Sequence, residues 1–298
     1  MIQSLIQLGE PIEHRGLVVS PVFPRRTPHA AYVTLDEALP LGFRVTEVDE
    51  AGAVPELEVV NPLEENVLLY DGEELVGAKQ NRILNVTVLV AAQSEARIPV
   101  SCVEQGRWSR QSAAFAAARH AANPQLRKRK AEALATQPLA LGAAQREVWE
   151  AVNETASLHS VHSPTGAQAD IFSARADALA NLRSAFPLQP GQCGAVLGAG
   201  GDFCLDYVSR PDAFARLYSK LLEGYLLDEL DRLDQEPVDM GELEAFVSGV
   251  AKARRSRRPS VALGEDVRLR GEDVVGSGLQ LDEELIQLSA YSSAGRRL

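Results

Sequence analysis

The sequence predicts an α+β protein, with a β-rich, sandwich- or barrel-like unit of antiparallel strands over residues 1–108 and an α+β unit over residues 109–298. Two observations predict it. Up to Trp108 the apolar residues come in short β-branched or aromatic runs bounded by Pro, Gly, Asp or Asn. Beyond Trp108, Ala-rich segments come first and strand-like runs return later, and this grouping favours antiparallel sheets over a doubly wound one. The two parts can also form one continuous domain.

In the first part, strand-like runs occupy residues 17–23, 43–48, 57–60 and 67–70. Thr34 precedes the sequence LDEAL and is followed by Glu37 three residues later, which is a capping-box signature for one short helix. Several short strands at close spacing are typical of an antiparallel sandwich or barrel.

The second part begins with segments that we expect to be helical, at residues 112–122, from Pro124 through the basic run 127–130, at 145–158 and at 170–182. The basic run is typical of a solvated helix face. A hairpin is expected over residues 193–208, because its Gly-rich turn is followed by a second strand rather than by the helix that a phosphate-binding loop needs.

Pro211 and Asp212 open the longest predicted helix, whose apolar residues recur at three-and-four spacing. A shorter helix at 240–253 ends in a basic run, as suits the negative end of a helix. The tail, 266–291, reads as three strands with turns at 271–272 and 282–283. We expect these strands to form one antiparallel sheet with the hairpin, with the helices on one face.

Length, charge and cysteine content limit the class of protein. A chain of 298 residues that is 45% hydrophobic can bury one large core or two ordinary ones. Its formal net charge of −11 repels nucleic acids and anionic membranes, so we expect neither as a partner. The N-terminus lacks the features of a signal peptide, and no apolar run is long enough to span a bilayer. With only Cys102, Cys193 and Cys204, we expect a cytoplasmic protein with free thiols.

The stretch 71–108 concentrates charged and amide side chains between strand-like runs. At period two, the pattern over residues 80–90 indicates a strand in which Arg82 heads an apolar row, and Glu104 continues a second row formed by residues 98, 100 and 102. A charge that extends an apolar row must be paired, hydrated or functional, because burial of a lone charge is costly. We expect Arg82 to pair first with Glu104 and second with Glu74, and Arg107 is the other candidate partner of Glu104.

Three functions are compatible with this cluster. In the first, it binds an anionic ligand, because Arg and Lys suit phosphate, amides suit ribose or base, and an indole can stack. The candidate ligand-binding residues are Lys79, Gln80, Asn81, Arg82, Asn85, Glu104, Arg107 and Trp108. In the second, the acidic residues neutralise every cation, and the module is structural or forms a homo-oligomer. In the third, the protein is a hydrolase that uses Cys102 or paired carboxylates, and the candidate catalytic residues are Cys102 and Glu104. A thiol nucleophile requires a base near it.

The remaining motifs leave the cofactor, if any, unknown. His159 and His162 lie three residues apart, but no Glu stands at a zincin spacing, so we predict no metal site.

The runs DGEELVGAKQNRILN and IPVSCVEQGRW, at 71–85 and 98–108, resemble a largely uncharacterised bacterial and archaeal family. It is named for its association with ADP-ribosylglycohydrolase and rhodanese–phosphatase superfamily proteins. The segments GDFCLDYVSRPDAFARLYSKLLEGY and GEDVRLRGEDVVGSGL are also similar to it, so the resemblance covers nearly the whole chain. It implies a family-level α+β domain and a nucleotide-like ligand in an ADP-ribose or NAD-related pathway, by association alone. It assigns no catalytic residues and leaves open whether the protein is an enzyme.

Overall fold

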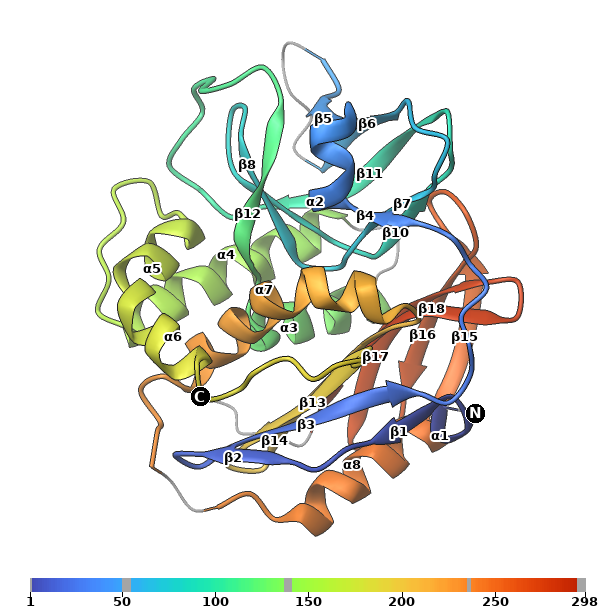
Figure 1. Cartoon of the computed structure of the whole chain (residues 1–298). Coiled ribbons are helices and arrows are strands. Elements are labelled where there is room, and N and C mark those ends of the chain that lie inside the picture. Colours follow the sequence, from blue (N-terminus) through green and yellow to red (C-terminus); the bar gives the residue numbers. More distant parts are fainter. Residues whose placement is uncertain (1, 50–54, 137–140, 235–236, 294–298) are drawn as a thin grey trace. The chain divides into compact units, whose positions relative to one another are not determined.

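A computed structural model describes residues 2–49, 55–136, 141–234 and 237–293 (Figure 1). The chain forms two compact units. The first unit contains residues 1–30, 178–258 and 265–298, and the second unit contains residues 31–177 and 259–264. The boundary predicted at residue 108 differs from this division, because it falls inside the second unit.

The first unit is built on a nine-stranded sheet. Its spatial order is β1 (Ile6–Leu8), β3 (Leu17–Pro24), β13 (Gly194–Ala199), β14 (Asp202–Val208), β18 (Glu284–Ser292), β17 (Val274–Leu281), β16 (Glu265–Arg270) and β15 (Arg254–Pro259), and β2 (Ile12–His14) also pairs with β3. The predicted hairpin and the three tail strands are confirmed, and they share this antiparallel sheet. The N-terminal strands belong to it because β3 pairs with β13.

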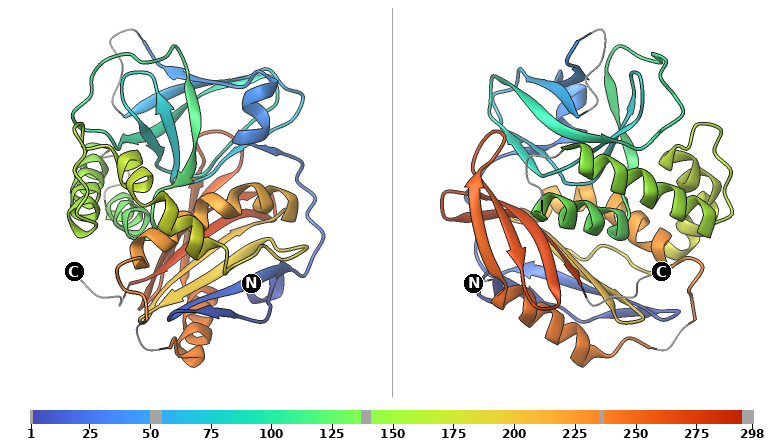
Figure 2. Two further views of the ribbon diagram at one scale, coloured as in Figure 1. Left: turned by 60° about the vertical axis from the view of Figure 1, so that its left-hand side comes forward. Right: turned by 180° about the vertical axis from the view of Figure 1, so that it is seen from behind.

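Two helices cover opposite faces of the nine-stranded sheet (Figures 1 and 2). They are α7 (Pro211–Glu229) and α8 (Met240–Lys252), and both were predicted from the sequence. The unit also contains the short helix α1 (Ile2–Leu5). Phe246 of α8 packs with Phe203 and Leu205 of β14, whereas α7 contacts β13 and β14 from the other side. The expectation of helices on one face was therefore wrong, because β13 and β14 are buried on both faces.

The basic run at 254–258 also departs from the prediction. The helix ends at Lys252, and Arg254 begins the edge strand β15 instead of lying at the helix terminus. Arginines on an edge strand hinder unwanted pairing with other strands.

The second unit contains two sheets around one apolar core. The larger has the order β12 (Phe115–Ala121), β8 (Glu73–Gly77), β9 (Arg82–Leu84), β11 (Ser94–Cys102), β6 (Glu56–Asn61) and β5 (Arg44–Glu47). The smaller has the order β10 (Val88–Val90), β7 (Val67–Leu69) and β4 (Val33–Thr34), in which β4 and β7 are parallel. Alternate residues of both sheets, such as Leu57, Leu84 and Val100 opposite Leu69 and Val88, fill the core. The α+β class is confirmed.

Helices of the second unit follow the predictions in part. The capping box of Thr34 and Glu37 is present and begins α2 (Leu35–Ala38), which continues into a 3₁₀ turn, Leu39–Leu41. The helices expected from Pro124 and over 145–158 are α3 (Pro124–Thr136) and α4 (Leu141–Leu158), which lie side by side (Figure 2). None of the helices in the described ranges has the length and apolar character needed to span a bilayer.

Three local predictions were wrong. Residues 112–122 do not form a helix, because Phe115–Ala121 pairs with β8 as β12 and this tertiary pairing overrides the high helix propensity of alanine. The strand expected over 80–90 divides into β9 and β10, which lie in different sheets. The helix expected over 170–182 breaks at Arg175 into α5 (Gln168–Ala174) and α6 (Ala176–Arg183).

Candidate functional site

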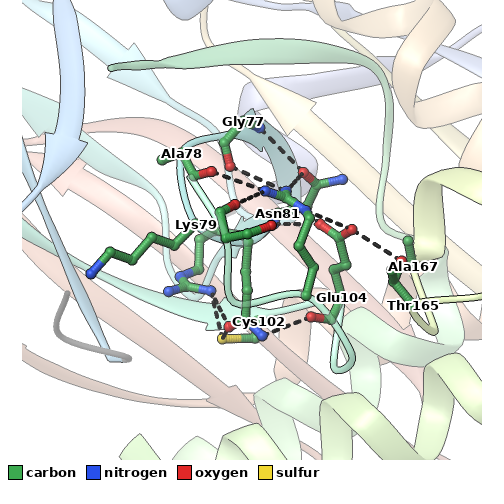
Figure 3. A network of polar contacts seen from close by, with 12 residues as sticks. Gly77, Ala78, Lys79, Asn81, Cys102, Glu104, Thr165 and Ala167 are labelled. Carbon is green, nitrogen blue, oxygen red and sulfur yellow. Dashed lines mark hydrogen bonds and ion pairs between the residues drawn. The ribbon is translucent and has the colours of Figure 1, made fainter. Parts of the chain in front are cut away.

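The candidate site lies in the second unit, where the turn between β8 and β9 meets the segment that follows β11 (Figure 3). Gly106 Nα–H donates to the Thr165 carbonyl oxygen at 2.7 Å. A Cβ at Gly106 would lie 3.0 Å from Thr165 Cα, so glycine permits this close approach. The approach places Glu104 and Arg107 beside the 78–81 turn.

Arg107 is the centre of a buried, self-paired network. Its Nε and Nη2 donate to the two carboxylate oxygens of Glu104 at 2.8 and 2.6 Å. Its remaining donors reach the Ala78 and Ser109 carbonyl oxygens at 2.9 and 3.0 Å and Asn81 Oδ1 at 3.1 Å. Of the two partners expected for Glu104, Arg107 is therefore the one observed, and the first-choice pairing with Arg82 was wrong.

Glu104 accepts further hydrogen bonds from the Asn81 backbone N–H at 3.1 Å and from the Thr165 hydroxyl at 3.0 Å. Burial alone would raise the pKa of Glu104, but the hydrogen bonds from Arg107 and Asn81 outweigh it and hold the pKa below its usual value. Glu104, Arg107 and Asn81 thus fix the path of the turn.

Acid should weaken this network in a defined pH range. Because the folded-state pKa of Glu104 is depressed, its contribution to stability is present above the unfolded pKa of about 4.3 and is lost as pH falls through the folded value. We expect Glu104→Gln to be less stable than the parent at neutral pH, with a difference that shrinks below about pH 4. Urea unfolding at pH 3 to 7 measures this difference. Glu95→Gln, at an exposed position on β11, is the control, and a constant difference for Glu104→Gln would contradict the prediction.

Arg82 lies in a different environment. Its side chain is 0% exposed, and its Nη1 donates to Gln80 Oε1 at 2.9 Å and contacts Cys102 Sγ at 2.6 Å. Within the described part of the chain, its Nε and Nη2 have no hydrogen-bond partner. Glu47 Oε1 is 4.0 Å from Nη2, too far for a hydrogen bond. Neither predicted partner, Glu104 or Glu74, is thus paired with Arg82 in the structure.

A tryptophan and a lysine adjoin Arg82. The Trp108 ring centroid lies 5.9 Å from Arg82 Cζ and 5.5 Å from Lys79 Nζ, within cation–π range. Trp108 is 50% exposed, and Lys79 is half-buried and points away from the Arg107 network (Figure 3). Lys79, Gln80, Arg82 and Trp108 are thus brought together. Asn85 lies beyond the other end of β9, where its Oδ1 accepts from the Ser101 hydroxyl at 2.9 Å.

Cys102 is a buried thiol held between Arg82 and Gln80. Burial raises its pKa although the nearby Arg82 charge lowers it, so the neutral thiol is favoured. None of the five histidines, all in the described ranges, hydrogen bonds to its sulfur. This environment is that of a structural cysteine more than of a nucleophile.

Sequence reasoning missed two features of the second unit. Glu47 follows Val45 at period two on β5, so the rule that selected Arg82 also applies to Glu47. A second buried cluster centres on Glu74, whose Oε2 lies 2.8 Å from His120 Nε2 and accepts from Gln168 Nε2 at 2.7 Å. His120 stacks on Phe172 with a centroid separation of 3.8 Å. The Glu74 cluster is contributed by β8, β12 and α5, which are far apart in the sequence, so no local sequence pattern indicates it.

Among the described residues, no three His, Cys, Asp or Glu side chains are close enough together to hold a metal ion.

Comparisons with known proteins give one match. No curated protein and no solved structure matches the chain. Residues 5–291 match the model of the ARG and Rhodanese-Phosphatase-superfamily-associated Protein domain, which confirms the resemblance carried by the 71–108 motif and the later segments. Because that match covers almost all of the 298 residues, the chain belongs to the family of ARG and Rhodanese-Phosphatase-superfamily-associated proteins.

Proposed function

We propose that the second unit binds an anionic, nucleotide-like small molecule at a site formed by Lys79, Gln80, Arg82 and Trp108. The observation that carries the proposal is the guanidinium of Arg82, which is fully buried while two of its nitrogens, Nε and Nη2, lack a hydrogen-bond partner within the described ranges. A buried donor left unsatisfied costs about 1–3 kcal/mol. Such a cost is typical of a site that completes its hydrogen bonds with a ligand or with ordered water.

The surroundings of Arg82 support a ligand with both a charge and a flat ring. The indole of Trp108 is half exposed and offers a stacking face, while Lys79 adds a second cation beside it. Arg107 and Glu104 neutralise each other, so they contribute the fixed geometry of the turn rather than contacts to an anion. The candidate residues thus have two roles. The ligand contacts Lys79, Gln80, Arg82 and Trp108, whereas Asn81, Glu104 and Arg107 hold the turn in place.

The family name supports the choice of ligands for testing. Its association with ADP-ribosylglycohydrolase makes ADP-ribose and NAD the first candidates, in a cytoplasmic pathway in which the buried cysteines, none of them in a disulfide, stay reduced. The structural alternative is supported by the self-pairing of Arg107, Glu104 and Asn81, and it predicts that none of these ligands binds.

Tryptophan fluorescence gives a direct test. The chain has two tryptophans, so Trp149→Phe leaves Trp108 as the reporter at the site. In this background we expect ADP-ribose, NAD or ADP to quench the emission and raise the melting temperature, because a ligand that binds only the native state stabilises it. Arg82→Met should weaken binding by tenfold or more, since a charged hydrogen bond contributes about 1.5–3 kcal/mol.

The matched control is Arg97→Met, which removes an exposed arginine from β11 and should leave the affinity unchanged. Titrations with and without magnesium separate direct binding from metal-bridged binding. Absence of quenching, of heat and of a thermal shift for all three ligands would overturn the proposal and leave the structural alternative.

A further inference from the structure

The nine-stranded sheet of the first unit ends at β15, and the outer side of this strand is open. β15 is the last strand in the order of the sheet and lies outside β16 (Figure 1). Each of its residues is exposed or half-buried. Within the described ranges, no backbone hydrogen bond joins β15 to a segment outside the sheet. Its outer N–H and C=O groups therefore form an edge with which an extended peptide can pair.

This edge is strongly positive, although the net charge of the chain is −11. Together β15 and β16 hold six arginines and only two carboxylates, those of Glu265 and Asp266. Glu265 Oε2 lies 3.6 Å from Arg257 Nη1. Asp266 Oδ2 is shared by Arg258 and Arg268, at 2.7 and 2.9 Å. The two carboxylates therefore leave the two strands with an excess of positive charge, which attracts an acidic partner.

Arg254 is the arginine of β15 that is best placed for such a partner. Its side chain is exposed and makes no hydrogen bond or ion pair within the described ranges. Arg255 and Arg257 lie two residues apart and therefore on one face of the strand. Burial and the charge of Arg257 together lower the pKa of Arg255. Carboxylates of an acidic strand along this edge would offset the repulsion between the two arginines.

The chemistry of the edge decides between partners. A second copy of the chain paired along β15 would set arginines opposite arginines, which is destabilising. Nucleic acid has no peptide groups to pair with the strand, and β15 carries no aromatic side chain on which a base could stack. We propose that β15 is a docking site for an extended acidic segment of a partner protein, which adds a strand to the sheet and pairs its carboxylates with the arginines.

Fluorescence anisotropy with labelled peptides tests the proposal on the full chain. The probe is a fluorescein-labelled peptide of alternating Glu and Thr, as long as β15, and its charge control has Lys in place of each Glu. We expect the Glu peptide to bind and the Lys peptide to bind at least about tenfold more weakly, because several cross-strand charge pairs change from attractive to repulsive. Absence of binding by the Glu peptide, or equal affinity of the two peptides, would overturn the proposal.

Two N-methylated forms of the Glu peptide test whether it pairs as a strand. One form carries the methyl groups on its odd residues and the other on its even residues, and only one of these sets directs its N–H groups toward β15. We expect one form to lose affinity by about tenfold while the other keeps most of it. If both forms bind as tightly as the parent peptide, or labelled oligothymidylate of equal charge binds more tightly, the strand addition is wrong.

Arg254→Glu locates the peptide on β15, because it reverses the charge of the edge without breaking an ion pair within the described ranges. We expect it to weaken the Glu peptide by about tenfold and to strengthen the Lys peptide. The matched control is Arg26→Glu, which makes the same charge change at an exposed arginine outside β15 and should leave both affinities unchanged. An equal loss in the two variants would show a response to overall charge alone and would overturn docking at β15.

Discussion

Replacement of Asp71 by alanine is expected to lower the free energy of unfolding by about 3–5 kcal/mol, because it removes the carboxylate that pairs with the buried Lys130 ammonium. Lys130 Nζ donates to Asp71 Oδ1 and, at 2.7 Å, to the Leu84 carbonyl oxygen. Both side chains are almost completely buried. The pair therefore connects α3 to the start of β8 and the end of β9 inside the second unit.

A double-mutant cycle distinguishes the stranded charge from lost packing. Lys130→Met alone strands Asp71 and should be similarly destabilising, whereas Asp71→Ala combined with Lys130→Met removes both charges and should recover much of the loss. Lys128→Met, two residues earlier on α3 and half-buried, is the control. Urea unfolding measures all four variants. Additive effects of the two single changes would show that the charges do not interact.

Lys130 also shows what a basic run in a sequence cannot establish. The prediction of a solvated face over 127–130 was wrong, because Arg127 and Lys130 are buried while Lys128 and Arg129 are partly exposed. Residues 127 and 130 lie three apart and therefore on one face of α3, but only the packing against Asp71 and Tyr70 shows that this face is buried. The spacing of residues shows which of them share a helix face, but whether that face is buried depends on the distant segment that packs against it.

In the candidate site, too, the local pattern predicts which residues are buried but not which partners they contact. Alternation predicted that Arg82 and Glu104 are buried, and it applies to Glu47 as well, because these residues extend apolar rows of strands. Alternation does not determine which carboxylate meets which arginine. Glu104 meets Arg107 because the chain turns sharply after β11, and the turn depends on Gly106 against Thr165, 59 residues away. The α+β class needed only local patterns, whereas the pairing needed the tertiary structure.

Replacement of Arg107 by methionine should have the other large effect on stability. We expect a loss of about 3–5 kcal/mol, because Glu104 becomes a buried carboxylate without its cation. The Ala78 and Ser109 carbonyl oxygens lose their donor at the same time. Addition of Glu104→Gln to Arg107→Met removes the stranded charge and should restore part of the loss. Thermal and urea unfolding of Arg107→Met, Glu104→Gln and the double variant measure this recovery of stability. No recovery in the double variant would contradict the electrostatic explanation.

Arg82→Met should behave differently from Arg107→Met, although both arginines are buried in the same cluster. Arg82 makes side-chain hydrogen bonds through Nη1 alone, and its replacement also removes two nitrogens, Nε and Nη2, that have no partner among the described residues. The cost of the lost bonds and the gain from removing unsatisfied donors therefore oppose each other. We expect Arg82→Met to be at least about 2 kcal/mol more stable than Arg107→Met, while it loses ligand affinity. Equal destabilisation by the two changes would show that Arg82, like Arg107, serves the fold alone.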